Sequence, residues 1–134
     1  MNEHALWGWM KPRLPVGDFT RIESGISPGL PDVSYAIRRF EGWIELKATA
    51  QSSGYPFKPE RKGLRPSQLI WIPRRVSLGV HVLIVAAIGK DVAAWPGSIA
   101  SRFNDLHVDE LRDRASWWVN RRICRQIPEW ILKS

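Results

Sequence analysis

The sequence predicts an α/β (α+β) fold in which a central mixed β-sheet is flanked by helices. Residues 32–37 and 43–48 each alternate apolar and polar side chains, a pattern typical of half-buried strands. Residues 80–88 are apolar on both faces, which predicts a central strand covered on both sides. Helical patterns lie between and beside these strands, and that order favours a layered sandwich.

The segment before the first alternating strand predicts a short helix, a short strand and a loop. The helix covers residues 4–10, because Pro12 and Pro15 follow it. Residues 19–23 predict the strand. Residues 24–31 predict the loop, because glycines and prolines interrupt any regular pattern there.

The second half of the chain begins with a long loop. Residues 49–63 are polar and basic, and loops of this length often carry function. Pro66 favours the first position of a helix, which Pro73 is expected to end or kink early. Residues 91–95 then predict a further strand, and 97–104 a short helix.

A long helix is predicted at 109–126, where apolar residues recur at four-residue spacing. These residues are Leu111, Ala115, Val119, Ile123 and Ile127. Trp117 and Trp118 would lie about 100° apart on such a helix, so only one of them can face the core. The other would lie in a dimer interface, stack on DNA or pack on a second core surface.

Length and charge narrow the classes of function. The 134 residues suit one domain, 1–134, with a catalytic core at about 19–95 and a helical region at about 97–134. Twenty Lys and Arg outnumber thirteen Asp and Glu, and the net charge of +7 favours nucleic acid over membrane as a partner. Eight Trp suit either base contact or an aromatic core.

The sequence gives no support for several other classes of protein. The single Cys124 excludes an internal disulfide and a cysteine zinc cluster. No serine-hydrolase elbow, Walker loop or dinucleotide-binding glycine pattern is present. No apolar run approaches the ~20 residues of a membrane span, and no secretory signal is recognisable. We therefore expect a soluble, cytoplasmic protein.

Three polar residues on the two alternating strands predict a site. If the strands pair as a hairpin with their apolar residues on one face, Asp32, Glu45 and Lys47 share the other face. A turn at 38–39 would set Asp32 opposite Glu45, and a loop over 38–41 would set the two acids on a diagonal. A turn at 41–42 would instead separate them by about 20 Å.

Two carboxylates beside an ammonium suit metal-assisted hydrolysis. Mg²⁺ prefers oxygen ligands, keeps several waters and takes one or two carboxylates. A bound metal lowers the pKa of water and offsets charge on an attacked phosphate, while a lysine orients or deprotonates the water. The alternative is a solvated strand face with a minor salt bridge.

The motif Pro31-Asp32…Glu45-Leu46-Lys47 resembles the signature of the PD-(D/E)XK nuclease superfamily. A wider pattern resembles its VRR-NUC branch, which includes small standalone phage and bacterial members. That pattern is Ser24-Gly-Ile-Ser-Pro-Gly-Leu-Pro-Asp32, Gly42-Trp-Ile-Glu-Leu-Lys47 and Pro66-Ser-Gln68-Leu-Ile-Trp71. The resemblance covers about residues 21–88.

The resemblance implies a restriction-endonuclease-like core with Mg²⁺ or Mn²⁺ as cofactor. It implies that Asp32 and Glu45 bind the metal with help from the Leu46 carbonyl, and that Lys47 is the catalytic lysine. Gln68 would act from the helix beside the active site, on the lysine or the phosphate.

Further residues complete the predicted site. Glu23 would match an upstream acid that many junction resolvases add to the metal ligands. Basic residues around the helix at Pro66 are expected to contact DNA. They are Arg61, Lys62, Arg65, Arg74 and Arg75.

The predicted function is that of a metal-dependent DNA endonuclease. The resemblance favours branched DNA, Holliday junctions first, and symmetric junction cleavage requires two active sites and hence a homodimer. Two alternatives stay open: a site-specific or mismatch-type endonuclease on the same scaffold, and a non-catalytic basic DNA-binding module.

Overall fold

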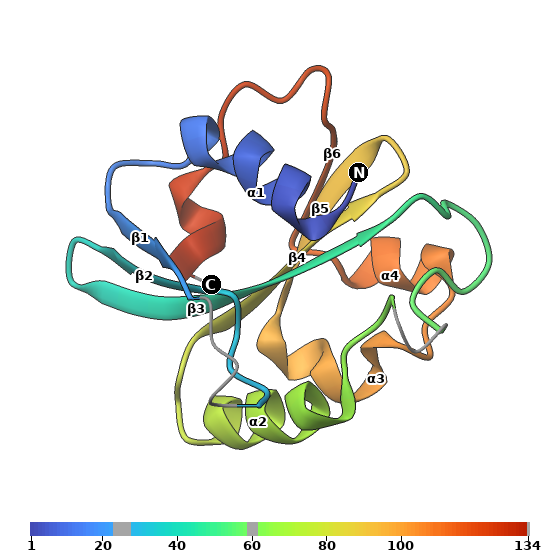
Figure 1. The fold of residues 1–134 in the computed structure, drawn as a ribbon, viewed down its shortest axis with the longest axis horizontal. Coiled ribbons are helices and arrows are strands. Elements are labelled where there is room, and N and C mark those ends of the chain that lie inside the picture. The colour runs from blue at the N-terminus through green and yellow to red at the C-terminus, as the bar shows by residue number, and fades with distance from the viewer. Residues whose placement is uncertain (23–27, 59–61, 134) are drawn as a thin grey trace.

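The computed structural model describes residues 1–22, 28–58 and 62–133. Within them a six-stranded sheet has the order β1-β2-β3-β4-β5-β6, antiparallel except for the parallel pair β3 and β4 (Figure 1). The strands are β1 (Asp18–Arg21), β2 (Val33–Ile37), β3 (Phe40–Thr49), β4 (Val82–Ile88), β5 (Asp91–Pro96) and β6 (Trp117–Asn120). The helices are α1 (Glu3–Met10), α2 (Pro66–Ser77), α3 (Ala100–Phe103) and α4 (Val108–Arg114), and 3-10 turns are η1 (Lys11–Arg13), η2 (Gly97–Ile99) and η3 (Glu129–Lys133). The predicted mixed sheet flanked by helices is confirmed.

Helices cover the sheet on both faces (Figure 1). On one face, Leu6 and Met10 of α1 and Leu132 of η3 pack with apolar residues of the strands. On the other, Ile72 of α2 and Phe103 of α3 pack with the opposite side chains of β4 and β5. All seven residues of β4 are buried, as its apolar sequence predicts for a central strand. No helix in the described residues is long and apolar enough to cross a bilayer.

The β2–β3 hairpin closes through a two-residue turn. Ile37 pairs with Phe40, and Arg38 adopts a φ of 55° in that turn. Two-residue hairpin turns need positive φ to match the twist of the strands, although glycine or asparagine adopts it more readily than arginine. Of the three registers open to the sequence, the structure has the one that sets Asp32 opposite Glu45.

Helix α2 connects the parallel strands β3 and β4, as a parallel pair requires. The helix begins at Pro66, as predicted, but it continues through Pro73 to Ser77. The expected early end at Pro73 is therefore wrong, and the alternative of a kink there stays a prediction. Pro73 costs the helix one hydrogen bond, while Ile72, the residue directly before it, is buried against the sheet and holds the helix in place.

The predicted long helix at 109–126 is wrong, and so is a wholly helical region at 97–134. Helix α4 ends at Arg114, and β6 then pairs with β5 through Val92 with Val119 and Ala93 with Trp118. Aromatic and β-branched residues favour a strand that has a neighbour to pair with. Successive strand residues point to opposite faces, so Trp117 packs on the α1 side and Trp118 on the α2 side.

Candidate active site

The predicted carboxylates and lysine lie on the α2 side of the sheet, with Asp32 directly before β2 and Glu45 and Lys47 on β3. Glu45 is 1% exposed and Lys47 is 5% exposed, whereas Asp32 is half-buried. The alternative of a solvated strand face is therefore wrong for Glu45 and Lys47. A buried carboxylate and a buried ammonium are costly unless partners compensate them.

Glu45 receives two partners through one of its oxygens. The Nζ of Lys47 lies 3.3 Å from Glu45 Oε2, and the Nε2 of Gln68 donates to the same oxygen at 2.6 Å. Gln68 is itself held, because its Oε1 accepts a hydrogen bond of 2.9 Å from the Arg65 backbone N–H at the start of α2. The structure thus brings Gln68 to the predicted site, where it contacts the acid.

Asp32 is fixed by backbone contacts on both sides. Its Oδ2 accepts a hydrogen bond of 2.8 Å from the Leu46 N–H, and its carbonyl accepts one of 2.7 Å from the Ile22 N–H. The loop before Asp32 packs against α2 at Gly29, whose φ is 87°. A Cβ there would lie 2.5 Å from the Ser67 carbonyl oxygen. Only glycine permits that approach, so the glycine lead-in seats Asp32 beside the helix that carries Gln68.

Glu3 of α1 joins the cluster, although it is not among the residues predicted for the site. One carboxylate oxygen from each of Glu3, Asp32 and Glu45 lies within 4.8 Å of the other two. Glu23, for which an upstream acid role is predicted, lies outside the described residues. A signal for Glu3 exists in the sequence: it precedes Leu6 and Trp7 at helical spacing, so it is the polar member of the stripe that faces the sheet.

Burial changes the protonation of Glu45 and Glu3. It raises the pKa of Glu45 to about 8, and the nearby Asp32 carboxylate adds to this rise while Lys47 opposes it. Burial likewise raises the pKa of Glu3, again against the effect of Lys47. Glu45 and Glu3 therefore stay protonated to a higher pH than exposed acids do, and a cation bound between them would favour their ionised forms.

The donor set fits a divalent metal ion. Glu45 Oε1 is buried and has no hydrogen-bond partner among the described residues. An orphaned carboxylate oxygen beside two further carboxylates offers the hard oxygen ligands that Mg²⁺ and Mn²⁺ prefer. The Leu46 amide is tied to Asp32, but the ligand role of its carbonyl stays a prediction.

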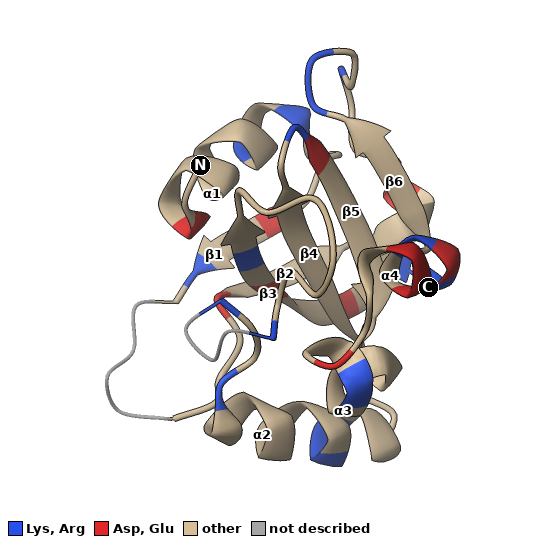
Figure 2. Cartoon of the chain, turned by 90° about the vertical axis from the view of Figure 1, so that its right-hand side faces the viewer, with Lys and Arg blue, Asp and Glu red and all other residues tan. Residues whose placement is uncertain are grey.

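The predicted DNA-contact residues divide into two places. Lys62 and Arg65 precede α2, where the Arg65 N–H donates to Gln68, and Arg74 and Arg75 lie near the other end of the helix. The Arg75 guanidinium stacks 4.7 Å from the Trp71 ring, and Arg61 lies outside the described residues. Basic segments also occur on α3 and after β6, so positive charge is spread over several sides of the molecule (Figure 2).

Comparison of the chain with models of protein families and with curated proteins gives no match. The resemblance to PD-(D/E)XK nucleases and the restriction-endonuclease-like core accordingly stay predictions. The candidate site stands on the geometry of its own side chains.

Proposed function

We propose that this protein is a metal-dependent DNA endonuclease that hydrolyses phosphodiester bonds. One observation carries the proposal: the carboxyl groups of Glu3, Asp32 and Glu45 converge, and buried Glu45 Oε1 accepts no hydrogen bond from a described residue. A buried acid without a full set of partners is destabilising. Its presence is understandable where a bound cation supplies the missing partner.

Each residue has a chemical role in the proposed reaction. Asp32, Glu45 and Glu3 would hold Mg²⁺ or Mn²⁺, which when bound offsets negative charge on the phosphate and makes water more acidic. Lys47 would position the attacking water, and its ammonium group would balance the charge that develops on the phosphate. Gln68 orients Glu45 through its 2.6 Å hydrogen bond. In-line attack would leave 5′-phosphate and 3′-hydroxyl ends, as the family resemblance implies.

The proposed substrate is branched DNA. The net charge of +7 supports a nucleic acid partner, and Arg65 at the start of α2 is close enough to the cluster to oppose the rise in the pKa of Glu3. A preference for four-way junctions, and the homodimer that symmetric cleavage requires, rest on the motif resemblance.

A cleavage panel tests the proposal. Purified protein is incubated with a labelled four-way junction, a flap, a nicked duplex and a linear duplex, each in Mg²⁺, in Mn²⁺ and in EDTA. Asp32→Ala and Lys47→Ala are assayed in parallel. We expect metal-dependent cleavage by the wild type, faster on branched DNA than on linear duplex, and loss of cleavage in both variants.

Other outcomes separate the alternatives. Cleavage in EDTA, or variants as active as the wild type, would exclude the proposed mechanism. Binding to all four DNAs without cleavage would favour a non-catalytic DNA-binding module. Cleavage of linear duplex at one sequence would favour a site-specific endonuclease that uses the same residues.

A further inference from the structure

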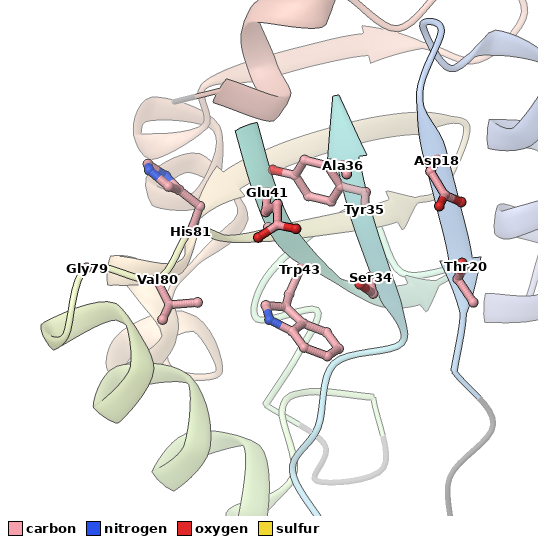
Figure 3. Close-up of a pocket in the computed structure, with 11 residues that line it drawn as sticks. Asp18, Thr20, Ser34, Tyr35, Ala36, Glu41, Trp43, Gly79, Val80 and His81 are labelled. Carbon is pink, nitrogen blue, oxygen red and sulfur yellow. The ribbon is translucent and has the colours of Figure 1, made fainter. Parts of the chain in front are cut away.

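A groove lies on the same face of the sheet as the carboxylate cluster, next to it along the strands. It has a volume of about 490 Å³ and is lined by residues of β1, β2 and β3 and by the turn that leads into β4. Figure 3 shows the side chains of Trp43, Ser34 and Thr20 at this groove. Neither the carboxylate cluster nor Gln68 lines it, so it is a separate feature of this face.

Strand pairing fixes the distance between groove and cluster. Ser34 pairs with Trp43, and the next pair on the same face is Asp32 with Glu45. Two residues along a strand span about 6.6 Å. A nucleotide next to a phosphate held at Glu45 would therefore reach the indole of Trp43.

The chemistry of the groove fits a nucleobase better than a phosphate. Its described lining includes no Lys or Arg, and two acids, Asp18 and Glu41, stand at its sides. These acids repel phosphate, but carboxylate and hydroxyl oxygens accept hydrogen bonds from the amino groups of bases. Trp43 is only half-buried and offers an aromatic surface for stacking.

The Trp43 side chain is held in a defined orientation. The Trp71 ring of α2 packs edge-to-face against it, with ring centroids 5.7 Å apart and an interplanar angle of 77°. A ring that is already ordered loses little conformational freedom on binding a base. Glu45, two residues along the same strand, is held by Gln68 and Lys47, so groove and cluster are both built on ordered side chains of β3.

We propose that this groove binds an unpaired nucleobase adjacent to the phosphate at the carboxylate cluster. The inference rests on the proposed nuclease function, which places the phosphate there. It narrows the substrate class, because a base stacked on Trp43 cannot remain stacked and paired in a continuous duplex. The preferred DNA therefore has unpaired nucleotides next to the cleaved bond, as in a flap or a splayed arm.

Base-dependent binding tests this inference without requiring cleavage. A fluorescein-labelled flap is prepared as a series in which one nucleotide near the branch is abasic, and affinities are measured by fluorescence anisotropy in EDTA. For the wild type we expect one abasic position to weaken binding about ten-fold, the scale of one lost base–aromatic stack. Trp43→Ala should bind the intact flap with about ten-fold lower affinity, and the abasic position should not weaken its binding further.

Two further variants keep the result interpretable. Trp43→Phe retains an aromatic ring and should keep the sensitivity to the abasic position, even if Trp43→Ala fails to fold. Trp130→Ala removes a tryptophan that is 55% exposed in η3 and should bind every flap as the wild type does.

An abasic series without effect on the wild type would overturn the inference, as would an equal abasic penalty in Trp43→Ala. The inference about the groove and the proposed nuclease function can fail independently. Base-dependent binding through Trp43 without cleavage in Mg²⁺ supports the groove and contradicts the nuclease. Cleavage in Mg²⁺ without base-dependent binding supports the nuclease and contradicts the role of the groove.

Discussion

Glu45 is the residue on which the proposed chemistry depends, and its burial makes it sensitive to pH. Its pKa is about 8 in the folded protein, against 4.5 for an ordinary glutamate. Between these values the unfolded chain has released the proton and the folded chain retains it. Raising the pH through this interval therefore favours unfolding of the metal-free protein.

The first prediction follows from this linkage. The melting temperature of the wild type in EDTA should fall as pH rises from about 5 to 8.5, and Glu45→Gln should flatten that fall because it cannot ionise. Mn²⁺ affinity of the wild type should rise over the same interval, because the metal binds the ionised carboxylate. Thermal denaturation and titration calorimetry measure the two effects. Equal pH profiles for wild type and variant would contradict the assignment.

Lys47 carries the second prediction. Lys47→Met removes the buried ammonium while keeping much of the side-chain volume, and we expect the cleavage rate at saturating Mg²⁺ to fall by about 10²-fold or more. Lys90→Met is the matched control, because Lys90 is exposed at the β4–β5 turn. Equal cleavage rates for Lys47→Met and Lys90→Met would show that Lys47 takes no part in the reaction.

The side-chain cluster was partly predictable from sequence. Alternation on two strands placed Asp32, Glu45 and Lys47 on one face, because side chains on a strand repeat every two residues. Glu3 was missed because its approach to Asp32 depends on how α1 docks on the sheet. Local patterns do not define that docking.

Among the elements, the hairpin turn shows where local patterns leave a choice open. All three candidate turns keep the apolar residues on one face, so alternation alone cannot select among them. Arg38-Arg39 lacks the Asn-Gly or Gly-rich signal of a two-residue turn, and the structure nevertheless places Arg38 at a φ of 55°. That conformation carries the cost of a non-glycine residue in the left-handed region.

The third prediction uses that strain. Arg38→Gly should raise the free energy of unfolding relative to Arg38→Val by about 1 kcal/mol or more, because only glycine adopts positive φ without steric cost. Both variants lose the exposed Arg38–Glu129 ion pair, so the comparison isolates the backbone. Urea denaturation measures the difference. Equal stabilities would show that the turn has a different conformation.

The C-terminal elements show a limit of periodicity. Apolar residues at four-residue spacing also satisfy the two-residue period of a strand, so Leu111, Ala115 and Val119 fit both structures. The choice depends on β5, whose outer edge pairs with Trp117 and Trp118. A single-sequence pattern does not contain that long-range pairing.

At the scale of the whole molecule, Lys and Arg are spread over several elements of the fold (Figure 2). The carboxylates of Glu3, Asp32 and Glu45, in contrast, lie within 4.8 Å of one another. Long-range attraction would bring DNA to the surface, and only local contacts would orient it. Residues beside the cluster are therefore expected to affect binding more than equally charged residues elsewhere.

The fourth prediction tests this division. Arg65→Ala should reduce the slope of log affinity against log salt concentration by about 0.9, the loss of one phosphate contact on duplex DNA. Arg122→Ala, which removes an exposed arginine after β6, should leave the slope unchanged. Anisotropy titrations of duplex DNA at several salt concentrations measure both. Equal slopes in the two variants would show that Arg65 makes no defined phosphate contact.

The central claim is that the buried carboxylate cluster binds the metal that cleaves DNA, and Glu45→Gln tests it most directly. Glutamine preserves the shape of Glu45 and removes the buried charge, so the variant should be at least as stable as the wild type in EDTA at pH 8. The measurement is the Mg²⁺-dependent cleavage rate of a labelled branched DNA by wild type and Glu45→Gln. We predict cleavage by the wild type in Mg²⁺ but not in EDTA, and a rate at least about 10³-fold lower for the folded variant. Cleavage by Glu45→Gln at the wild-type rate, or by the wild type in EDTA, would contradict the claim.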